Sequence, residues 1–205
     1  MSTATRTRRS DGARTHEAIL EAAAKLASVE GINGLTIGRL AEELGVSKSG
    51  LFAHFGSKEA LQLETIEAAQ AIFDREVMRP AYAAPAGRPR LEALFAAFFS
   101  YLERDVFPGG CFFASLLADE DARSGPVHEV TERIEREWLD DIARLVREAQ
   151  ELGHLRKDVD AEQLAFELDA FLELSNYHFV LFRDPVVLER GRVAVAERLS
   201  RAARG

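Results

Sequence analysis

The side chains best suited to chemistry in this sequence are hydroxyls and cations that can bind phosphate. Ser47, Lys48 and Ser49 stand at the expected start of a short helix, and His54 and Lys58 follow them. Phosphate oxygens accept hydrogen bonds from such groups and from the free N–H groups of a helix N-terminus, and lysine also donates to base edges. The pattern indicates contact with a nucleic acid, although a solvated pair of helices would also produce it.

Two short amphipathic helices are expected to hold these side chains. Thr36 is the expected N-cap of the first helix, because its hydroxyl can accept a hydrogen bond from an N–H group of the first turn. Gly45 ends that helix, since glycine adopts the left-handed backbone conformation without steric penalty. Val46 is expected to plug the core that the two helices share, which consists of Ile37, Leu40, Ala41, Leu44, Leu51 and Phe55.

The flanking segments extend this pair into a larger unit. Upstream, apolar residues at helical spacing predict a helix over residues 14–30 that stops at Gly31. Downstream, Gly56 closes the second helix of the pair, and Ser57 is the expected N-cap of a long helix. Short helices followed by a long one are typical of a DNA-binding head, so the flanks favour the nucleic-acid interpretation.

Residues 14–65 resemble the N-terminal domain of TetR-type transcriptional regulators. The resemblance rests on a first helix that ends at Glu30 and Gly31, on the run TIGRLAEELGVSKSGLF at residues 36–52 and above all on the run HFGSKEAL at residues 54–61. It implies that Thr36 and Ser47 contact phosphates. It also implies that Lys48 and Ser49 read the major groove.

His54 and Lys58 match further contacts of the family to the DNA backbone, and two other positions depart from the family pattern. Phe52 stands where the family commonly has a tyrosine that binds a phosphate, and a lost hydrogen bond to a charged group is worth about 1.5 to 3 kcal/mol. Gly50 costs up to about 1 kcal/mol in helix propensity, which close approach to DNA or tight helix packing would explain. The predicted DNA-contacting residues are Thr36, Arg39, Ser47, Lys48, Ser49, Phe52, His54 and Lys58.

The charge of the chain argues against strong non-specific DNA binding. The sequence holds 26 lysine and arginine residues and 34 aspartate and glutamate residues, a formal net charge of -8. Residues 1–60 hold 8 basic and 7 acidic residues, a net of +1, so the rest holds 18 and 27, a net of -9. We therefore expect dimerisation and direct readout of bases to supply much of the affinity.

The chain is expected to be all-α and cytoplasmic. Its 205 residues include 14 glycines and 6 prolines, and no strand-like alternation persists. Cys111 is the one cysteine, which excludes an internal disulfide, and it is expected to be a small buried residue rather than a redox sensor. We find no signal peptide, no apolar run of the roughly 18 residues that would span a membrane, and no motif for a cofactor or a metal.

The expected organisation is an N-terminal three-helix DNA-binding head joined to a larger helical body. The predicted segments are a flexible basic arm over residues 1–13, a helix-turn-helix DNA-binding domain over residues 14–60, and a helical effector-binding and dimerisation domain over residues 61–205. In the body, the long helix is expected to end at Pro80, residues 81–89 to form a loop, and the next helix to start at Arg90.

The last two helices are expected to form a homodimer interface. Between residues 164 and 182, 13 of 19 residues are apolar, too many for one buried face of a monomer. Two such helices from each of two subunits would give a four-helix interface, as the resemblance also implies. The recognition helices would then lie about 34 to 36 Å apart, one turn of B-DNA, so the predicted operator is a pseudo-palindrome.

The body holds most of the 13 phenylalanines of the chain. By resemblance to the family, an apolar pocket there takes a small effector, whose binding moves the two heads out of register with DNA. Aromatic residues at helical spacing also serve simply as core. The residues predicted to line the pocket are Phe95, Phe98, Phe99, Phe112, Phe113, Trp138, Phe166, Phe171 and Tyr177, with Asn176 and His178 as further polar groups.

The favoured function is a TetR-like repressor that binds double-stranded operator DNA as a homodimer and is released by a small, largely apolar effector. A DNA-binding regulator without a small-molecule effector is one alternative. An all-helical enzyme with an accidental helix-turn-helix pattern is another, although we expect no enzyme activity and no cofactor.

Overall fold

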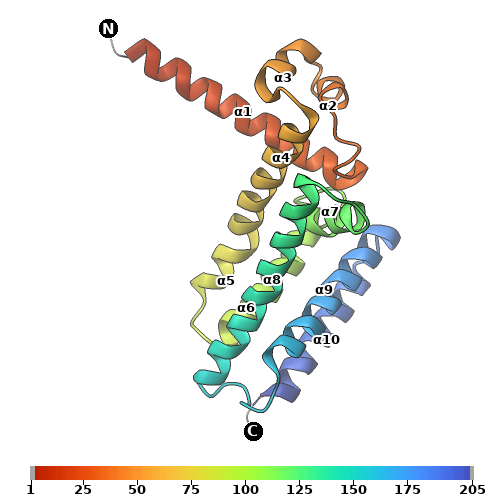
Figure 1. Ribbon diagram of the computed structural model, residues 1–205. Coiled ribbons are helices and arrows are strands. Elements are labelled where there is room, and N and C mark those ends of the chain that lie inside the picture. Colours follow the sequence, from red (N-terminus) through yellow and green to blue (C-terminus); the bar gives the residue numbers. More distant parts are fainter. Residues whose placement is uncertain (1–2, 204–205) are drawn as a thin grey trace. The chain divides into compact units, whose positions relative to one another are not determined.

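The protein is described here by a computed structural model that covers residues 3–203, with side chains from residue 14 onward. Figure 1 shows helices joined by short connections, and the described part of the chain forms no strand beyond an isolated bridge between Leu155 and Ala203. The predicted all-α fold is therefore confirmed. None of the helices in that part has the length and apolar character needed to cross a bilayer.

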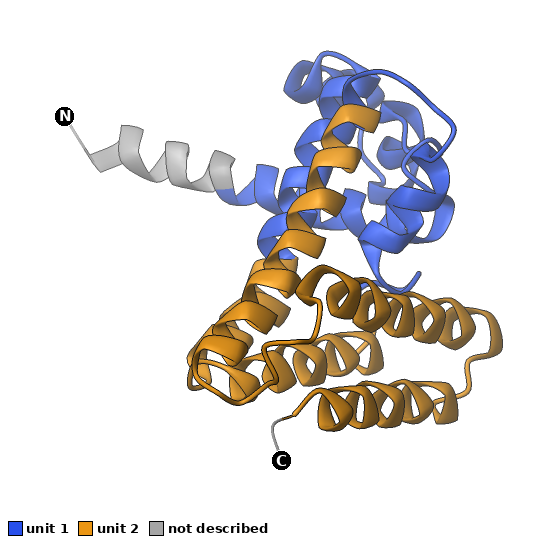
Figure 2. Cartoon of the chain, turned by 60° about the horizontal axis from the view of Figure 1, so that its bottom comes forward, with its two compact units in different colours: residues 1–72, 107–127 blue, residues 73–106, 128–205 orange. Residues whose placement is uncertain are grey.

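The helices form two compact units, which Figure 2 shows in different colours. Unit 1 consists of residues 1–72 and 107–127, and unit 2 consists of residues 73–106 and 128–205. The predicted division at residue 60 differs from this one. Residues 61–72 and the segment 107–127 pack with the predicted DNA-binding domain.

Unit 1 is built on a long first helix, α1 (Thr3–Glu30), which packs against α2 (Ile37–Leu44) and α7 (Phe112–Glu120). We predicted a flexible arm over residues 1–13, whereas α1 begins at Thr3; apart from Gly12, the segment holds no strong helix breaker. The helices of unit 1 are α1 (Thr3–Glu30), α2 (Ile37–Leu44), α3 (Lys48–Phe55), α4 (Lys58–Phe73) except its last residue, and α7 (Phe112–Glu120).

Small residues let α1 and the segment before α7 approach each other closely. Ala23, Ala24 and Ala27 of α1 are buried. A Cβ atom on Gly109 would overlap the carbonyl group of Ser28, and the Gly109 N–H donates to Ser28 Oγ at 3.2 Å. This contact explains why a segment far along the sequence belongs to the same unit as the first helix.

Unit 2 contains the remaining helices. A Cβ atom on Gly191 of the last helix would overlap Ser175 of α9 (Ala161–Phe182) and Phe99 of α6 (Arg88–Glu103), so this glycine lets the three helices pack closely. The elements are the π-helical turn η1 (Asp74–Met78), α5 (Arg79–Ala83), α6 (Arg88–Glu103), α8 (Pro126–Glu151) except its first two residues, α9 (Ala161–Phe182) and α10 (Val186–Ala202).

The prediction that the long helix ends at Pro80 is wrong. A π-helical turn precedes the proline, and in it the Arg79 N–H donates to the carbonyl of Asp74, five residues back. Because proline has no N–H and its ring crowds the carbonyl four residues earlier, this wider turn lets the helix pass through Pro80 into α5. The predicted loop shrinks to residues 84–87, and α6 begins at Arg88, two residues before the predicted start.

Candidate nucleic-acid interface

The ends of α2 are set by a side-chain cap and a left-handed glycine, as the sequence predicts. Thr36 Oγ1 accepts a hydrogen bond from the Arg39 N–H at 3.0 Å. Gly45 follows the helix with a φ of 64°, which residues with a Cβ adopt only at a steric cost. Leu40 is fully buried and turns the apolar face of α2 inward.

A side-chain cap starts α3, and two buried side chains place this helix against α2. Ser47 Oγ accepts a hydrogen bond from the Gly50 N–H at 3.2 Å. Leu51 and Phe55, one helical turn apart, are exposed by only 2% and 5%. Val46 does not plug the shared core, because its N–H is tied to the end of α2 and its side chain is 50% exposed.

Burial of Leu51 and Phe55 leaves the rest of α3 open to solvent. All the predicted contact residues on this helix and at its cap are exposed, and Phe52 reaches 55%. The structure therefore brings together on one short helix the residues Ser47, Lys48, Ser49, Phe52 and His54.

Lys48 also lies beside the start of α2. Its Nζ is 3.8 Å, and Thr36 Oγ1 is 3.9 Å, from the position that a Cβ on Gly38 would occupy. The lysine of α3 and the capping hydroxyl of α2 thus flank the same glycine. The two helices present these groups on a common surface.

The glycine inside α3 preserves the cap of that helix. A Cβ on Gly50 would lie 3.0 Å from Ser47 Oγ, which is closer than ordinary van der Waals contact. Gly50 is exposed, so tight packing against another helix does not explain it. An alanine here would press on the hydroxyl that accepts the first hydrogen bond of α3.

Two predicted contact residues have partners within unit 1. Arg39 Nη2 lies 2.6 Å from Glu30 Oε1 and 2.9 Å from Glu43 Oε2, and hydrogen bonds to these carboxylates raise the pKa of the guanidinium. Lys58 Nζ donates to the carbonyl of Asn33 at 2.6 Å. The two carboxylates hold the guanidinium of Arg39, whereas Lys58 uses one of its three N–H donors on the carbonyl.

His54 belongs to a group of rings that the sequence did not reveal. Its ring centroid lies 5.9 Å from that of His16 on α1 and 6.2 Å from that of Phe55. His16 Nε2 is 2.8 Å from Glu64 Oε2 of α4, at hydrogen-bond distance. No spacing in the sequence marks His16 or Glu64, because only the fold brings α1 and α4 beside α3.

The nine residues predicted to line an effector pocket are divided between the two units. Phe112 and Phe113 belong to unit 1, where Phe112 packs against Phe107 with ring centroids 5.7 Å apart. Phe166 and Tyr177 are 63% and 62% exposed on α9. The two phenylalanines of α7 therefore belong outside unit 2, and the two residues of α9 lie on the surface of unit 2.

The other five predicted residues lie in unit 2, and most of them are packed against one another. Phe73 lies between Phe98 and Trp138, with ring centroids 6.4 Å and 5.5 Å from its own. Phe95, Phe98 and Phe99 are exposed by 3% or less. Phe171 instead lines a cavity of about 280 Å³ between α9 and α10.

Three carboxyl groups lie near Trp138 in unit 2. Trp138 Nε1 donates to Asp169 Oδ1 at 2.7 Å. Burial, reinforced by the neighbouring carboxylates, raises the pKa of Glu135 and of Glu173 to about 7. Burial also raises the pKa of Asp169, although the hydrogen bond from Trp138 opposes the rise. Each shift means that the folded protein disfavours the ionised carboxylate.

Two family models match the sequence. The model described as bacterial regulatory proteins of the tetR family matches residues 19–65, which contain α2 and α3. The model described as the tetracyclin repressor-like C-terminal domain matches residues 87–195, more than half of the chain. No curated protein matches the sequence.

Solved structures of similar fold cover nearly the whole chain. A TetR transcriptional regulator from Chloroflexus aurantiacus J-10-FL is 26% identical, covers 95% of this chain and 98% of its own, and has a TM-score of 0.86. A putative transcriptional regulator from Saccharomonospora viridis in complex with choline is 23% identical, covers 92% and 96%, and has a TM-score of 0.73. The ketosteroid transcriptional regulator KstR2 of Mycobacterium tuberculosis is 20% identical, covers 91% and 94%, and has a TM-score of 0.64.

The carboxyl groups near Trp138 make the stability of unit 2 depend on pH. Because the pKa values of Glu135 and Glu173 are raised to about 7, the folded state binds more protons than the unfolded state between about pH 4.5 and pH 7. The free energy of unfolding should therefore fall as the pH rises through this window. Urea denaturation followed by the fluorescence of Trp138, the one tryptophan of the chain, measures it.

The double variant Glu135→Gln and Glu173→Gln should show a weaker decline than the wild type over the same window. Glu151→Gln, which removes an exposed carboxylate from the end of α8, is the matched control and should leave the decline unchanged. Equal slopes in the double variant and the wild type would contradict the assignment.

Proposed function

The chain belongs to the TetR family of transcriptional regulators, and on this premise we propose that it is a repressor. It binds a pseudo-palindromic operator as a homodimer and is released by a small, largely apolar effector. The observation that carries the proposal is the surface of α3. This helix buries Leu51 and Phe55 and leaves Lys48, Ser49 and Phe52 exposed beside the N-cap of α2.

We assign α3 to the major groove. Lys48 and Ser49, in the first turn of the helix, are placed to donate to base edges, since the N-terminal residues of a recognition helix make such contacts. Thr36 and Ser47 are assigned to phosphates. Phe52 packs on the sugar-phosphate backbone without donating a hydrogen bond.

The remaining predicted contacts are assigned to the backbone of the DNA. His54 is exposed at the end of α3 and can donate to a phosphate from its ring. Arg39 and Lys58 serve first to hold the head together, through Glu30, Glu43 and the carbonyl of Asn33. Arg39 reaches a phosphate by exchanging a carboxylate, whereas Lys58 can donate to a phosphate with a second N–H.

We place the homodimer interface on α9 and α10, which lie side by side (Figure 1). Four large apolar side chains of α9 follow one helical stripe and are exposed by 56% to 63%: Phe166, Leu174, Tyr177 and Leu181. Val186 and Val193 of α10 are exposed by 52% and 48%. A stripe of this extent calls for a partner, and a second copy of the chain would cover it by twofold symmetry.

We place the effector in unit 2, beside Trp138. The rings of Phe73, Phe98 and Tyr101 surround one side of this region, and Asp169 offers a polar group to the other end of a ligand. Two similar solved structures, a regulator in complex with choline and a ketosteroid transcriptional regulator, support a small ligand with an apolar part. A regulator without an effector is the second candidate, which the tight packing of Phe95, Phe98 and Phe99 favours.

Base readout by α3 can be tested on a selected operator. Operator DNA is selected from a random duplex pool with the wild-type protein, and we expect the enriched sequence to be a pseudo-palindrome. Lys48→Ala should weaken binding to that sequence by about fivefold or more, since contacts to bases are worth about 1 to 3 kcal/mol. A fluorescence-anisotropy titration at fixed salt measures the affinity.

Lys157→Ala removes the same charge from an exposed position in unit 2 and serves as the control. It should leave the affinity within about twofold of wild type, as expected for a lysine that makes no phosphate contact. If Lys48→Ala behaves in the same way as the control, Lys48 does not read the operator.

A separate prediction concerns dimerisation. Leu174→Glu places a charge in the middle of the exposed apolar stripe of α9 and should convert the dimer into a monomer, because the charge would be buried without a partner in the interface. Sedimentation equilibrium gives the mass, and circular dichroism should show unchanged helix content.

Leu152→Glu is the control for this variant, since Leu152 is 52% exposed but lies outside α9 and α10. It should remain a dimer. A dimeric Leu174→Glu protein would place the interface on another surface.

Another prediction concerns the effector. N-phenyl-1-naphthylamine, a neutral apolar dye, should bind near Trp138 and accept its excitation energy, and a ligand that displaces the dye should release the operator. Trp138→Phe should keep dye binding but lose the energy transfer. Absence of dye binding at saturating concentration would favour the regulator without an effector.

A further inference from the structure

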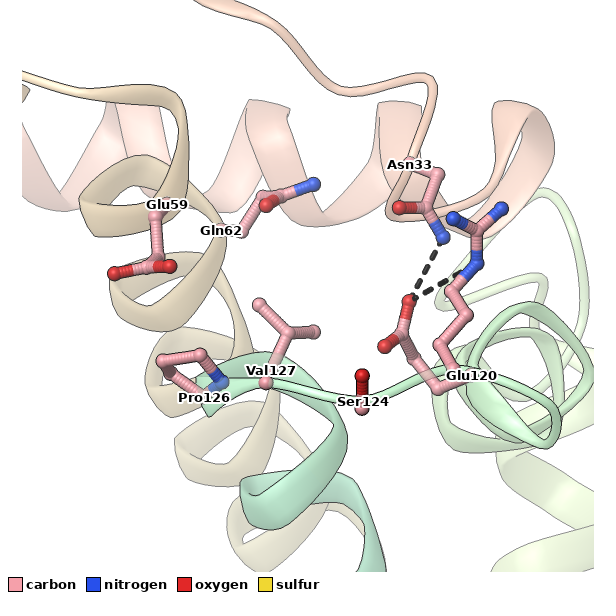
Figure 3. A pocket seen from close by; sticks show the side chains of 9 residues that line it. Asn33, Glu59, Gln62, Glu120, Ser124, Pro126 and Val127 are labelled. Atoms are coloured by element: carbon pink, nitrogen blue, oxygen red, sulfur yellow. Dashed lines mark hydrogen bonds and ion pairs between the residues drawn. The ribbon is translucent and has the colours of Figure 1, made fainter.

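Unit 1 contains a polar pocket that the DNA-binding surface does not use. Its volume is about 410 Å³, within the size range of small-molecule sites. Figure 3 shows that its walls come from the connection after α1, the first turns of α4, the end of α7 and the residues that lead into α8. The side chains that matter to its chemistry are Asn33, Glu59, Gln62, Glu120, Arg123 and Val127.

A buried amide offers this pocket an acceptor. Gln62 is only 6% exposed, and its Nε2 donates to the carbonyl of Ile32 at 2.6 Å. Because a carbonyl can only accept, this bond fixes which end of the amide faces Ile32 and turns Oε1 away from it. Among the residues that the structure describes, none donates a hydrogen bond to Gln62 Oε1. Gln62 Oε1 is therefore an available acceptor for a ligand in the pocket.

The charges of the pocket favour a cation. Glu120 is 3% exposed and accepts a hydrogen bond from Asn33 Nδ2 at 2.8 Å, and the guanidinium of Arg123 lies 3.8 Å from it. Figure 3 marks both interactions with dashed lines. Glu59 adds a second, exposed carboxylate to the lining. Two carboxylates and one guanidinium leave a net negative charge, so an anion would be repelled.

The remaining wall is apolar. Pro126 and Val127 line the pocket on the side of α8, and Figure 3 shows both side chains between Glu59 and Ser124. They can contact methylene groups but cannot donate or accept through their side chains. The described residues hold no group of three His, Cys, Asp or Glu side chains arranged for a metal ion. The lining therefore suits an organic cation.

We propose that this pocket binds a short aliphatic amine. An ammonium group donates hydrogen bonds to Gln62 Oε1 and is attracted by the carboxylates of Glu59 and Glu120, while the methylene chain lies against Pro126 and Val127. The site lies in unit 1, whereas the apolar effector is assigned to unit 2. Its occupancy can therefore be tested without an operator and without an effector.

The position of the pocket links it to the DNA-binding head. Lys58 and Gln62 of α4 donate hydrogen bonds to the carbonyls of Asn33 and Ile32, respectively. Both carbonyls lie in the connection that leads into α2. A ligand bound to Gln62 Oε1 would restrain the side chain that donates to the Ile32 carbonyl, and so would restrain this connection. Binding should therefore raise the thermal stability of unit 1.

The test uses 1,4-diaminobutane as the probe and the full-length protein. Isothermal titration calorimetry at physiological salt, where charges more than about 8 Å apart are largely screened, should detect saturable binding with one site per chain. 1,4-Butanediol has the same carbon chain without the charge and should not bind. Binding of the diol as tightly as the diamine, or no binding of the diamine at millimolar concentration, would overturn the proposal.

A pair of variants separates the site from general attraction to an acidic chain. Glu59→Gln removes the exposed carboxylate of the pocket and should weaken diamine binding about two- to fivefold, the usual effect of an exposed ion pair. Glu67→Gln removes an exposed carboxylate from the same helix outside the pocket and should leave the affinity unchanged. Equal affinities of the two variants would overturn the proposal.

Discussion

The burial of Leu40, Leu51 and Phe55 in one small core is the interaction on which the DNA-binding surface depends. Helices α2 and α3 have eight residues each, and helices of that length are not stable alone in water. The shared core holds both, and the caps and glycines at their ends satisfy the backbone groups that so short a helix leaves unpaired. Once these side chains point inward, the opposite face of α3 has to point outward.

Electrostatics play a smaller part in this surface than in many DNA-binding proteins. Residues 1–60 have a net charge of only +1, and Arg39 is held by two carboxylates. Among the side chains that the structure describes, from residue 14 to 203, the free cation of the α2–α3 surface is Lys48. Contacts from hydroxyls and from a symmetric second copy therefore have to supply much of the affinity for DNA. The rest of unit 1, residues 61–72 and 107–127, adds five acidic residues and one basic residue to the head. This balance makes the proposed dimer a requirement for tight binding.

The sequence predicted the parts of the fold that depend on local physics. Thr36, Ser47 and Gly45 behave as predicted because caps and left-handed turns involve only neighbouring residues. The passage of the helix through Pro80 was missed, since a π-helical turn depends on the packing of the whole helix and leaves no clear signal in the sequence. The contacts of Arg39 with Glu30 and of His54 with His16 were missed for the same reason, because each partner lies on another helix and tertiary packing brings it close.

The aromatic residues show where helical spacing alone misled the prediction. On α9, Leu164, Leu168 and Leu172 follow one buried stripe. A second stripe, two residues out of phase with the first, is exposed and consists of Phe166, Leu174, Tyr177 and Leu181. The pocket predicted from residue type therefore combined side chains from two different faces of the helix. A helix that is apolar on two faces has to be covered on both. The inner stripe is covered within unit 2, and a second copy of the chain is the partner that we propose for the outer one.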